Sequence, residues 1–170
     1  MGNIETARVS TALNREVFNF GFSGNCHFDT AVAQFLVQIE APSAVIVDCM
    51  WNEAGPGITA AATAFVQYLR AHGLPAATPV VLAEGLPFGR NWAVPAAAAA
   101  QTADNAALRA AFAALRAAGD AALYYVDTAA LFSNASETDS ATAAGLHATD
   151  AGMHDMAAAF IEMLPSILAQ

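Results

Sequence analysis

Two apolar segments of the sequence each end abruptly in a polar turn, and this repeated arrangement restricts the possible folds more than any other feature. The first covers residues 16–20 and ends in Gly21-Phe22-Ser23-Gly24-Asn25, and the second covers residues 44–48 and ends in Cys49-Met50-Trp51-Asn52. A helical pattern lies between them. In an open parallel sheet, ligands bind beyond the carboxyl ends of the strands. We therefore expect Gly24 and Asn52 to face the same crevice.

The rest of the chain continues this alternation of strands and helices. Such alternation predicts an α/β fold, a doubly wound parallel sheet of the flavodoxin-like, three-layer α/β/α kind, within one domain over residues 1–170. Thr59 and Thr149 or Asp150 are expected to cap helices. The predicted strands cover residues 16–20, 44–48, 78–83 and 122–126, the helices 3–14, 30–39, 59–72, 104–119 and 150–164, and the main loops 84–92 and 133–144.

Charge and composition exclude several classes of function. The six basic residues are all arginine and form no cluster, against fifteen acids and a net charge of −9, so we expect no nucleic-acid partner. No run approaches the roughly 20 strongly apolar residues of a membrane span, so no membrane partner is expected. The start of the chain lacks the pattern of a signal peptide, which predicts a cytoplasmic location. The absence of lysine beside abundant alanine suggests a bacterial source.

The two cysteines, Cys26 and Cys49, each follow a predicted strand end and could lie near each other. A pair of cysteines is no disulfide framework, and the chain has no metal-ligand spacing. We therefore favour two free thiols that pack as small apolar residues, and we expect neither a metal nor a cofactor.

Three residues in polar turns suggest acyl-transfer chemistry. A backbone N–H of Gly24 and the side-chain amide of Asn52 could both donate to an oxyanion. His147 could serve as general base toward a hydroxyl nucleophile. Taken singly, each residue is more often structural: glycine permits a positive φ, asparagine satisfies turns, and many histidines only pack. His27 is a further candidate for substrate contact, since it lies beside the Gly24 turn.

The order of these residues along the chain and the sequences around them favour a functional role over a structural one. The segments Asn19–Asn25, Val47–Asn52 and Gly145–Gly152 resemble the sequence blocks of the SGNH (GDSL-like) hydrolase superfamily, most closely the branch whose second block reads N-x-G-F-S-G-N. The likeness extends from about residue 12 to the end. It implies that Gly24 and Asn52 build the oxyanion hole and that His147 is the base. The Gly24 block and the C-terminal block are the more specific matches. The Asn52 block is less specific, because the glycine that usually precedes the family's asparagine is absent here.

Two other features depart from the family. No G-D-S-like block with the nucleophilic serine precedes Gly24: Ser10 lacks a strand and a glycine elbow, and Ser23 half-matches Gly-x-Ser-x-Gly but corresponds to a serine that is not the family's nucleophile. The family's acid lies three residues before the histidine, where this chain has Ala144. Asp139 is the nearest substitute, whereas Asp150 is expected to start the last helix.

These departures lead to two hypotheses. The first is an esterase or acylhydrolase domain for small carboxylic esters, including acetylated sugars, with low activity in the chain as given. The second is an inactive binding or interaction module that retains the crevice. Because the family's first strand has no counterpart, we expect either an N-terminally incomplete hydrolase or a compact four-stranded derivative that forms homo-oligomers through an exposed strand edge.

Overall fold

The structure is a computed structural model that describes residues 4–128, 141–143 and 145–169. The chain separates into two compact units. The sheet unit comprises residues 22–85 and 100–126, and the hairpin unit comprises residues 1–21, 86–99 and 127–170. Each unit is described by itself.

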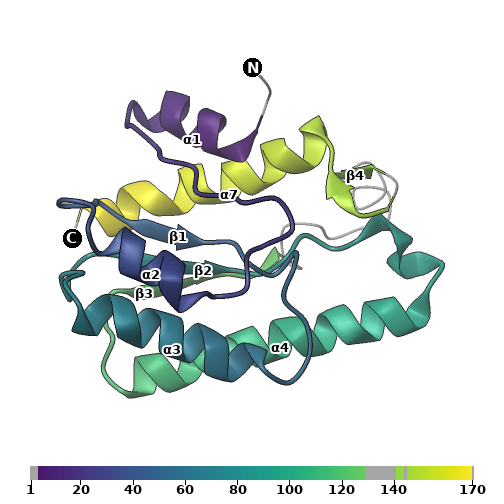
Figure 1. The fold of residues 1–170 in the computed structure, drawn as a ribbon. Coiled ribbons are helices and arrows are strands. Elements are labelled where there is room, and N and C mark those ends of the chain that lie inside the picture. Colours follow the sequence, from purple (N-terminus) through teal and green to yellow (C-terminus); the bar gives the residue numbers. More distant parts are fainter. Residues whose placement is uncertain (1–3, 129–140, 144, 170) are drawn as a thin grey trace. The chain divides into compact units, whose positions relative to one another are not determined.

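The sheet unit is built on three parallel strands in the order β1-β2-β3 (Figure 1). They are β1 (Val45–Val47), β2 (Val80–Ala83) and β3 (Leu123–Val126). In register, Val80 lies opposite both Val45 and Leu123. All four residues of β2 are fully buried, as expected of a continuous apolar run in the centre of a parallel sheet.

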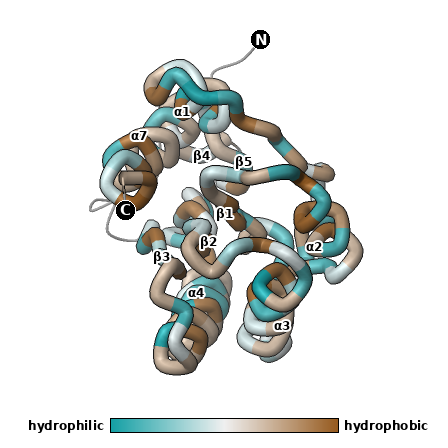
Figure 2. Tube along the Cα trace, turned by 90° about the vertical axis from the view of Figure 1, so that its left-hand side faces the viewer, coloured by the Kyte–Doolittle hydropathy of each residue, from teal (hydrophilic) through white to brown (hydrophobic). Residues whose placement is uncertain are grey.

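Three helices accompany this sheet: α2 (Thr30–Leu36), α3 (Ile58–Ala71) and α4 (Pro95–Ala117), whose first five residues belong to the hairpin unit. Figures 1 and 2 both show α3 and α4 along the same side of the strands. The core of the sheet unit contains Ile58 and Leu69 of α3, Leu108 of α4 and Leu82 of β2. Cys49, directly beyond β1, joins the same core.

In the described residues, the hairpin unit contains two helices along their whole length, the first five residues of α4, a 3-10 turn and a short antiparallel pair of strands. Its elements are α1 (Glu5–Leu13), η1 (Gly89–Trp92), β4 (Thr142–Ala143), β5 (His147–Ala148) and α7 (Asp150–Leu168). Helix α1 packs on α7. Thr149 caps α7 as expected, since its side-chain oxygen accepts the Gly152 N–H at 3.2 Å. None of the helices in the described ranges is both long and apolar enough to cross a membrane.

The α/β class and the parallel sheet are confirmed, but the strand predicted over residues 16–20 is wrong. No strand occurs anywhere in residues 14–29, all of which are described. Phe18 is 61% exposed and stacks on Phe20, with 6.3 Å between ring centroids. The side chain of Asn19 accepts the Gly21 N–H at 2.8 Å, a local bond that competes with sheet pairing.

Several predicted boundaries also need correction. Helix α4 begins at Pro95 rather than at residue 104 or 105, because proline suits the first helical position and the alanine run after it favours helix. Thr59 does not cap α3; its hydroxyl donates to the Ala107 carbonyl at 2.8 Å. Helix α2 ends at Leu36, before residue 39. Residues 142–143 form β4 instead of loop, whereas residues 133–140 and 144 lie outside the described ranges.

Candidate functional site

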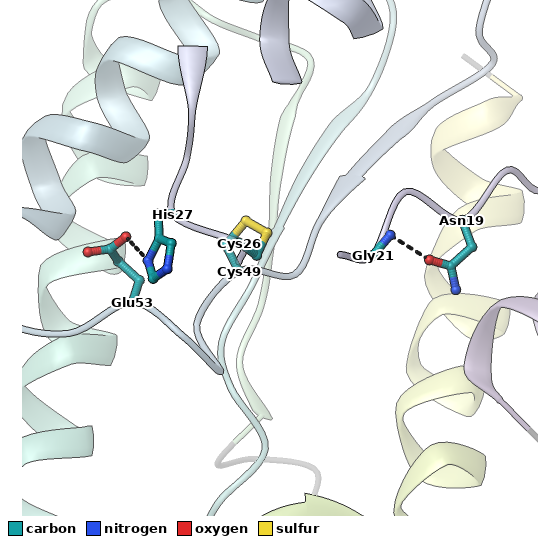
Figure 3. The surroundings of a disulfide bond; sticks show 6 residues. All are labelled: Asn19, Gly21, Cys26, His27, Cys49 and Glu53. Atoms are coloured by element: carbon teal, nitrogen blue, oxygen red, sulfur yellow. Dashed lines mark hydrogen bonds and ion pairs between the residues drawn. A yellow bond between two sulfur atoms is a disulfide. The ribbon is translucent and has the colours of Figure 1, made fainter. Parts of the chain in front are cut away.

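A disulfide bond joins Cys26 to Cys49, with 4.9 Å between their Cα atoms (Figure 3). The expectation that the two residues lie close is confirmed, and the expectation of free thiols is wrong. Cysteine number alone could not decide between these outcomes. The bond connects the segment that enters α2 with the segment that leaves β1. It therefore links the two polar turns in which Gly24 and Asn52 lie.

The Gly24 turn is exposed and shaped by local bonds. Gly24 has a φ of +77°, which glycine adopts without strain. The side-chain amide of Asn25 donates to the carbonyls of Phe22 at 3.0 Å and Ser23 at 2.9 Å, and so holds the turn together. Among the described residues, none accepts the Gly24 N–H, and a Cβ added to Gly24 would meet nothing within 4 Å. The N–H can therefore donate to a ligand.

The Asn52 turn follows β1 and is fastened at several points. The Cys49 carbonyl accepts the N–H groups of Asn52 at 3.2 Å and Glu53 at 3.3 Å. Further along, the Gly55 N–H donates to Asp104 Oδ1 at 2.8 Å, which ties the segment to α4. The side chain of Asn52 is exposed and forms no hydrogen bond within the described part of the chain. Its amide is thus also available to a ligand.

His27 and Glu53 form a second link between the same two segments. His27 Nδ1 lies 3.2 Å from Glu53 Oε2, and the side chains are 46% and 17% exposed (Figure 3). A carboxylate on Nδ1 orients an imidazole ring. The sequence placed His27 beside the Gly24 turn but gave no sign of this partner.

His147 belongs to the hairpin unit, where it lies in β5 opposite Ala143 of β4. The hairpin is fixed on η1: the Arg90 N–H donates to the Gly145 carbonyl at 3.3 Å, and the Gly89 N–H donates to Thr142 Oγ1 at 2.9 Å. A Cβ on Gly145 would lie 2.9 Å from Arg90 Cβ, so this close approach requires glycine. The exposed imidazole of His147 makes no hydrogen bond to any described residue.

The remaining candidates from the sequence have mostly structural contacts. The Ser10 hydroxyl donates to the Arg15 carbonyl at 2.7 Å, beyond the end of α1. Ser23 lies in the exposed Gly24 turn with a φ of 24°. Asp150 is the first residue of α7, whereas Asp139 and Ala144 fall outside the described ranges. The structure thus brings the Gly24 and Asn52 turns together within the sheet unit and places His147 in the other unit.

Glu84 is a buried acid that the sequence did not single out, although it follows a predicted strand directly. It is 1% exposed, and its carboxylate accepts from Arg109 at 2.6 Å and from the hydroxyl of Tyr125. Asn105 lies at 3.4 Å from the same carboxylate. Arg109 and Asn105 belong to α4 and Tyr125 to β3, so Glu84 fastens this helix to the sheet.

Neither a metal centre nor a second site in the groove between α3 and α4 occurs in the described part of the chain. No group of three or more His, Cys, Asp or Glu side chains there could hold a metal ion. A shallow groove of about 370 Å³ lies between α3 and α4. It is lined largely by apolar side chains beside Arg70 and Asp120, which satisfy each other, so nothing in it suggests chemistry.

Comparison with known proteins completes this description. A structure from Bacteroides ovatus ATCC 8483, described as a GDSL-like lipase, is similar with a TM-score of 0.83 and 26% identity over 97% of this chain and 47% of its own. The salicylyl-acyltransferase SsfX3 from a tetracycline biosynthetic pathway shares the fold, with a TM-score of 0.75 and 15% identity over 96% of this chain and 48% of its own. The chain therefore spans about half the length of these two structures.

No curated protein matches the chain. The model of the GDSL-like lipase/acylhydrolase family, in contrast, matches residues 1–165 of the 170. The polar turns at Gly24 and Asn52, joined by a disulfide beyond β1, lie within that match. The chain belongs to the GDSL-like lipase/acylhydrolase family.

Proposed function

We propose that the chain hydrolyses small carboxylic esters, such as acetyl esters of carbohydrates, by acyl-transfer chemistry. One observation carries the proposal: in a chain of this family, a disulfide joins the two turns whose exposed donors are the Gly24 N–H and the Asn52 amide. A tetrahedral intermediate needs hydrogen-bond donors at its oxyanion, and the disulfide keeps together the two turns that carry them.

The reaction assigns one role to each of three residues. His147 takes the proton from an attacking hydroxyl, whose oxygen forms a bond to the ester carbonyl carbon. The carbonyl electrons move to the oxygen, where the Gly24 N–H and the Asn52 amide donate to the resulting oxyanion. When the intermediate collapses, the bond to the alcohol oxygen breaks, and His147 returns the proton to the departing alkoxide. Ester and water are thus converted to the free acid and the alcohol, and His147 returns to its neutral form.

In the chain as given, the attacking hydroxyl belongs to a water molecule. Ser10 is engaged with the Arg15 carbonyl, and Ser23 matches no nucleophile of the family. An oxyanion hole and a binding site alone accelerate hydrolysis by about 10³-fold over water. We therefore expect slow turnover that still exceeds the uncatalysed rate clearly.

The test is hydrolysis of p-nitrophenyl acetate by the full chain. His147→Ala is expected to lower kcat by about 10²-fold or more, because general-base catalysis contributes about 10²–10⁴-fold. His154→Ala is the matched control, since His154 is an exposed histidine of α7 that contacts only Asp155 among described residues. Equal rates for wild type and His147→Ala would refute the assigned role. A Ser23→Ala variant without activity would instead identify Ser23 as the nucleophile.

The alternative function is an inactive module that binds esters without turnover. It is favoured by the His147 imidazole, which lacks a hydrogen bond within the described residues, and by alanine at the position of the family's acid. A nonhydrolysed acetyl-sugar that binds in calorimetry, with no hydrolysis above background, would support this alternative.

A further inference from the structure

Two links fasten the same pair of segments in the sheet unit, residues 22–27 and residues 49–53. The first is the Cys26–Cys49 disulfide, and the second is the contact of His27 Nδ1 with Glu53 Oε2 at 3.2 Å (Figure 3). Cys26 and His27 are neighbours in the chain, and Cys49 and Glu53 share one turn. The two segments are therefore held together at two nearby points.

The two ends of the disulfide differ in their surroundings. Cys49 is 4% exposed and belongs to the core of the sheet unit, where it follows β1 directly. Cys26 is half-buried and lies at the end of an exposed turn that contains Gly24. The bond thus anchors an exposed, irregular segment to the buried core of the unit.

The Gly24 turn needs such an anchor because its own bonds are short-range. Asn25 fixes the shape of the turn through the Phe22 and Ser23 carbonyls, only two or three residues away. These bonds do not determine where the turn lies relative to Asn52. A Cβ at Gly24 would meet nothing within 4 Å, so packing around this residue does not hold it either.

We propose that the Cys26–Cys49 disulfide positions the Gly24 and Asn52 donors relative to each other, so that its reduction slows ester hydrolysis. This inference rests on the proposed function. Cys26 and Cys49 are positioning residues, as are His27 and Glu53. The effect falls on kcat because a misplacement of about 1 Å can cost about 10²-fold in rate when donors must meet a developing oxyanion.

The chemistry of the switch is thiol–disulfide exchange with a dithiol. One thiolate of the reductant attacks a sulfur of the protein bond, and its second thiolate then releases the mixed disulfide. The Sγ–Sγ bond of Cys26 and Cys49 breaks and takes up two electrons and two protons, which yields two thiols. The reductant becomes a cyclic disulfide. The His27–Glu53 contact then remains as the second link, and partly exposed pairs of this kind hold weakly.

The experiment compares the oxidised chain, the chain reduced with dithiothreitol, and the double variant Cys26→Ser with Cys49→Ser. Arg70→Ala is the control variant. The Arg70 guanidinium binds Asp120 and the carbonyls of Thr78 and Ala122, which precede β2 and β3, so it stabilises the strand ends opposite the disulfide. Two quantities are measured where all forms are folded: kcat and KM for p-nitrophenyl acetate, and backbone order parameters of the Gly24 and Asn52 amides.

Reduction and the double variant are expected to lower kcat about tenfold or more, with KM changed less than about twofold. The order parameters should fall from about 0.85 toward 0.6. Arg70→Ala should leave both quantities as in the oxidised wild type. Unchanged kcat and order parameters after reduction would overturn the inference, and so would an equal loss of kcat in Arg70→Ala.

The two proposals can fail separately. If His147→Ala abolishes hydrolysis but reduction leaves it intact, the proposed function stands and the positioning role is refuted. If the oxidised chain hydrolyses no ester, the proposed function fails. The order parameters then decide the positioning role alone: a fall on reduction supports it, and constant values refute it.

Discussion

Single residues in this chain act through contacts that the sequence reveals only partly. Gly24 and Asn52 could be chosen from the sequence because each follows an apolar segment and matches a family block. Their availability to a ligand is a structural observation, since it depends on which neighbours accept or donate. Glu84 illustrates the opposite case: a charged residue after a strand reads as a loop residue, although it is buried among partners from α4 and β3.

Replacing Glu84 by glutamine is expected to lower the free energy of unfolding by about 1–3 kcal/mol. The amide lacks the negative charge that pairs with Arg109, and its NH2 group replaces the oxygen that faces the Asn105 amide, so a buried acceptor is lost. Urea denaturation measures the loss. Arg109→Gln tests the other side of the pair and should cost at least as much, because it leaves a carboxylate that is 1% exposed without its cation. Glu84→Gln with wild-type stability would show that the network is unimportant.

Elements with strong periodicity or continuous apolar runs were predictable, whereas elements defined by tertiary partners were not. Strand β2 and helix α7 appear where the pattern places them. Residues 16–20 have a strand-like composition, but they form no strand, and the side chain of Asn19 accepts the Gly21 N–H instead. The hairpin of β4 and β5 consists of two residues on each side, too short for any pattern to indicate.

The start of α7 provides a test at this scale. A Cβ added to Gly152 would lie 2.2 Å from the Ala141 carbonyl oxygen and 3.1 Å from Leu86 Cδ2. Because the first clash is with backbone, Gly152→Ala should lower the free energy of unfolding by about 1–3 kcal/mol. Gly57→Ala, where a Cβ meets nothing within 4 Å, should leave stability nearly unchanged. Equal thermal stability of both variants would contradict this account of how the helix begins.

For the whole molecule, the family and the α/β class followed from the sequence, and the disulfide did not. Two cysteines without a framework leave pairing undecided until the segments that contain them are placed in space. The single domain and the self-association through a strand edge remain predictions. So does the cytoplasmic location, and a disulfide is more typical of oxidising compartments.

The disulfide should also stabilise the folded chain. It closes a loop with a sequence separation of 23, which corresponds to about 3 kcal/mol from the restricted unfolded state. Urea denaturation with and without a reductant measures this contribution, and the Cys26→Ser, Cys49→Ser double variant should match the reduced protein. The double variant has no disulfide and should not respond to the reductant. A urea midpoint below that of the oxidised wild type would confirm the stabilisation, and an equal midpoint would contradict it.

The central claim is that the Asn52 amide stabilises the oxyanion of an ester-hydrolysing site. The most direct measurement is kcat for p-nitrophenyl acetate with Asn52→Ala and, as a control, Glu40→Ala, which changes an exposed residue between α2 and β1. Removal of one oxyanion donor costs about 10²–10³-fold in kcat. We predict a fall of that size for Asn52→Ala, toward the uncatalysed rate, with no change for Glu40→Ala. Equal kcat values for Asn52→Ala and the wild-type chain would contradict the account.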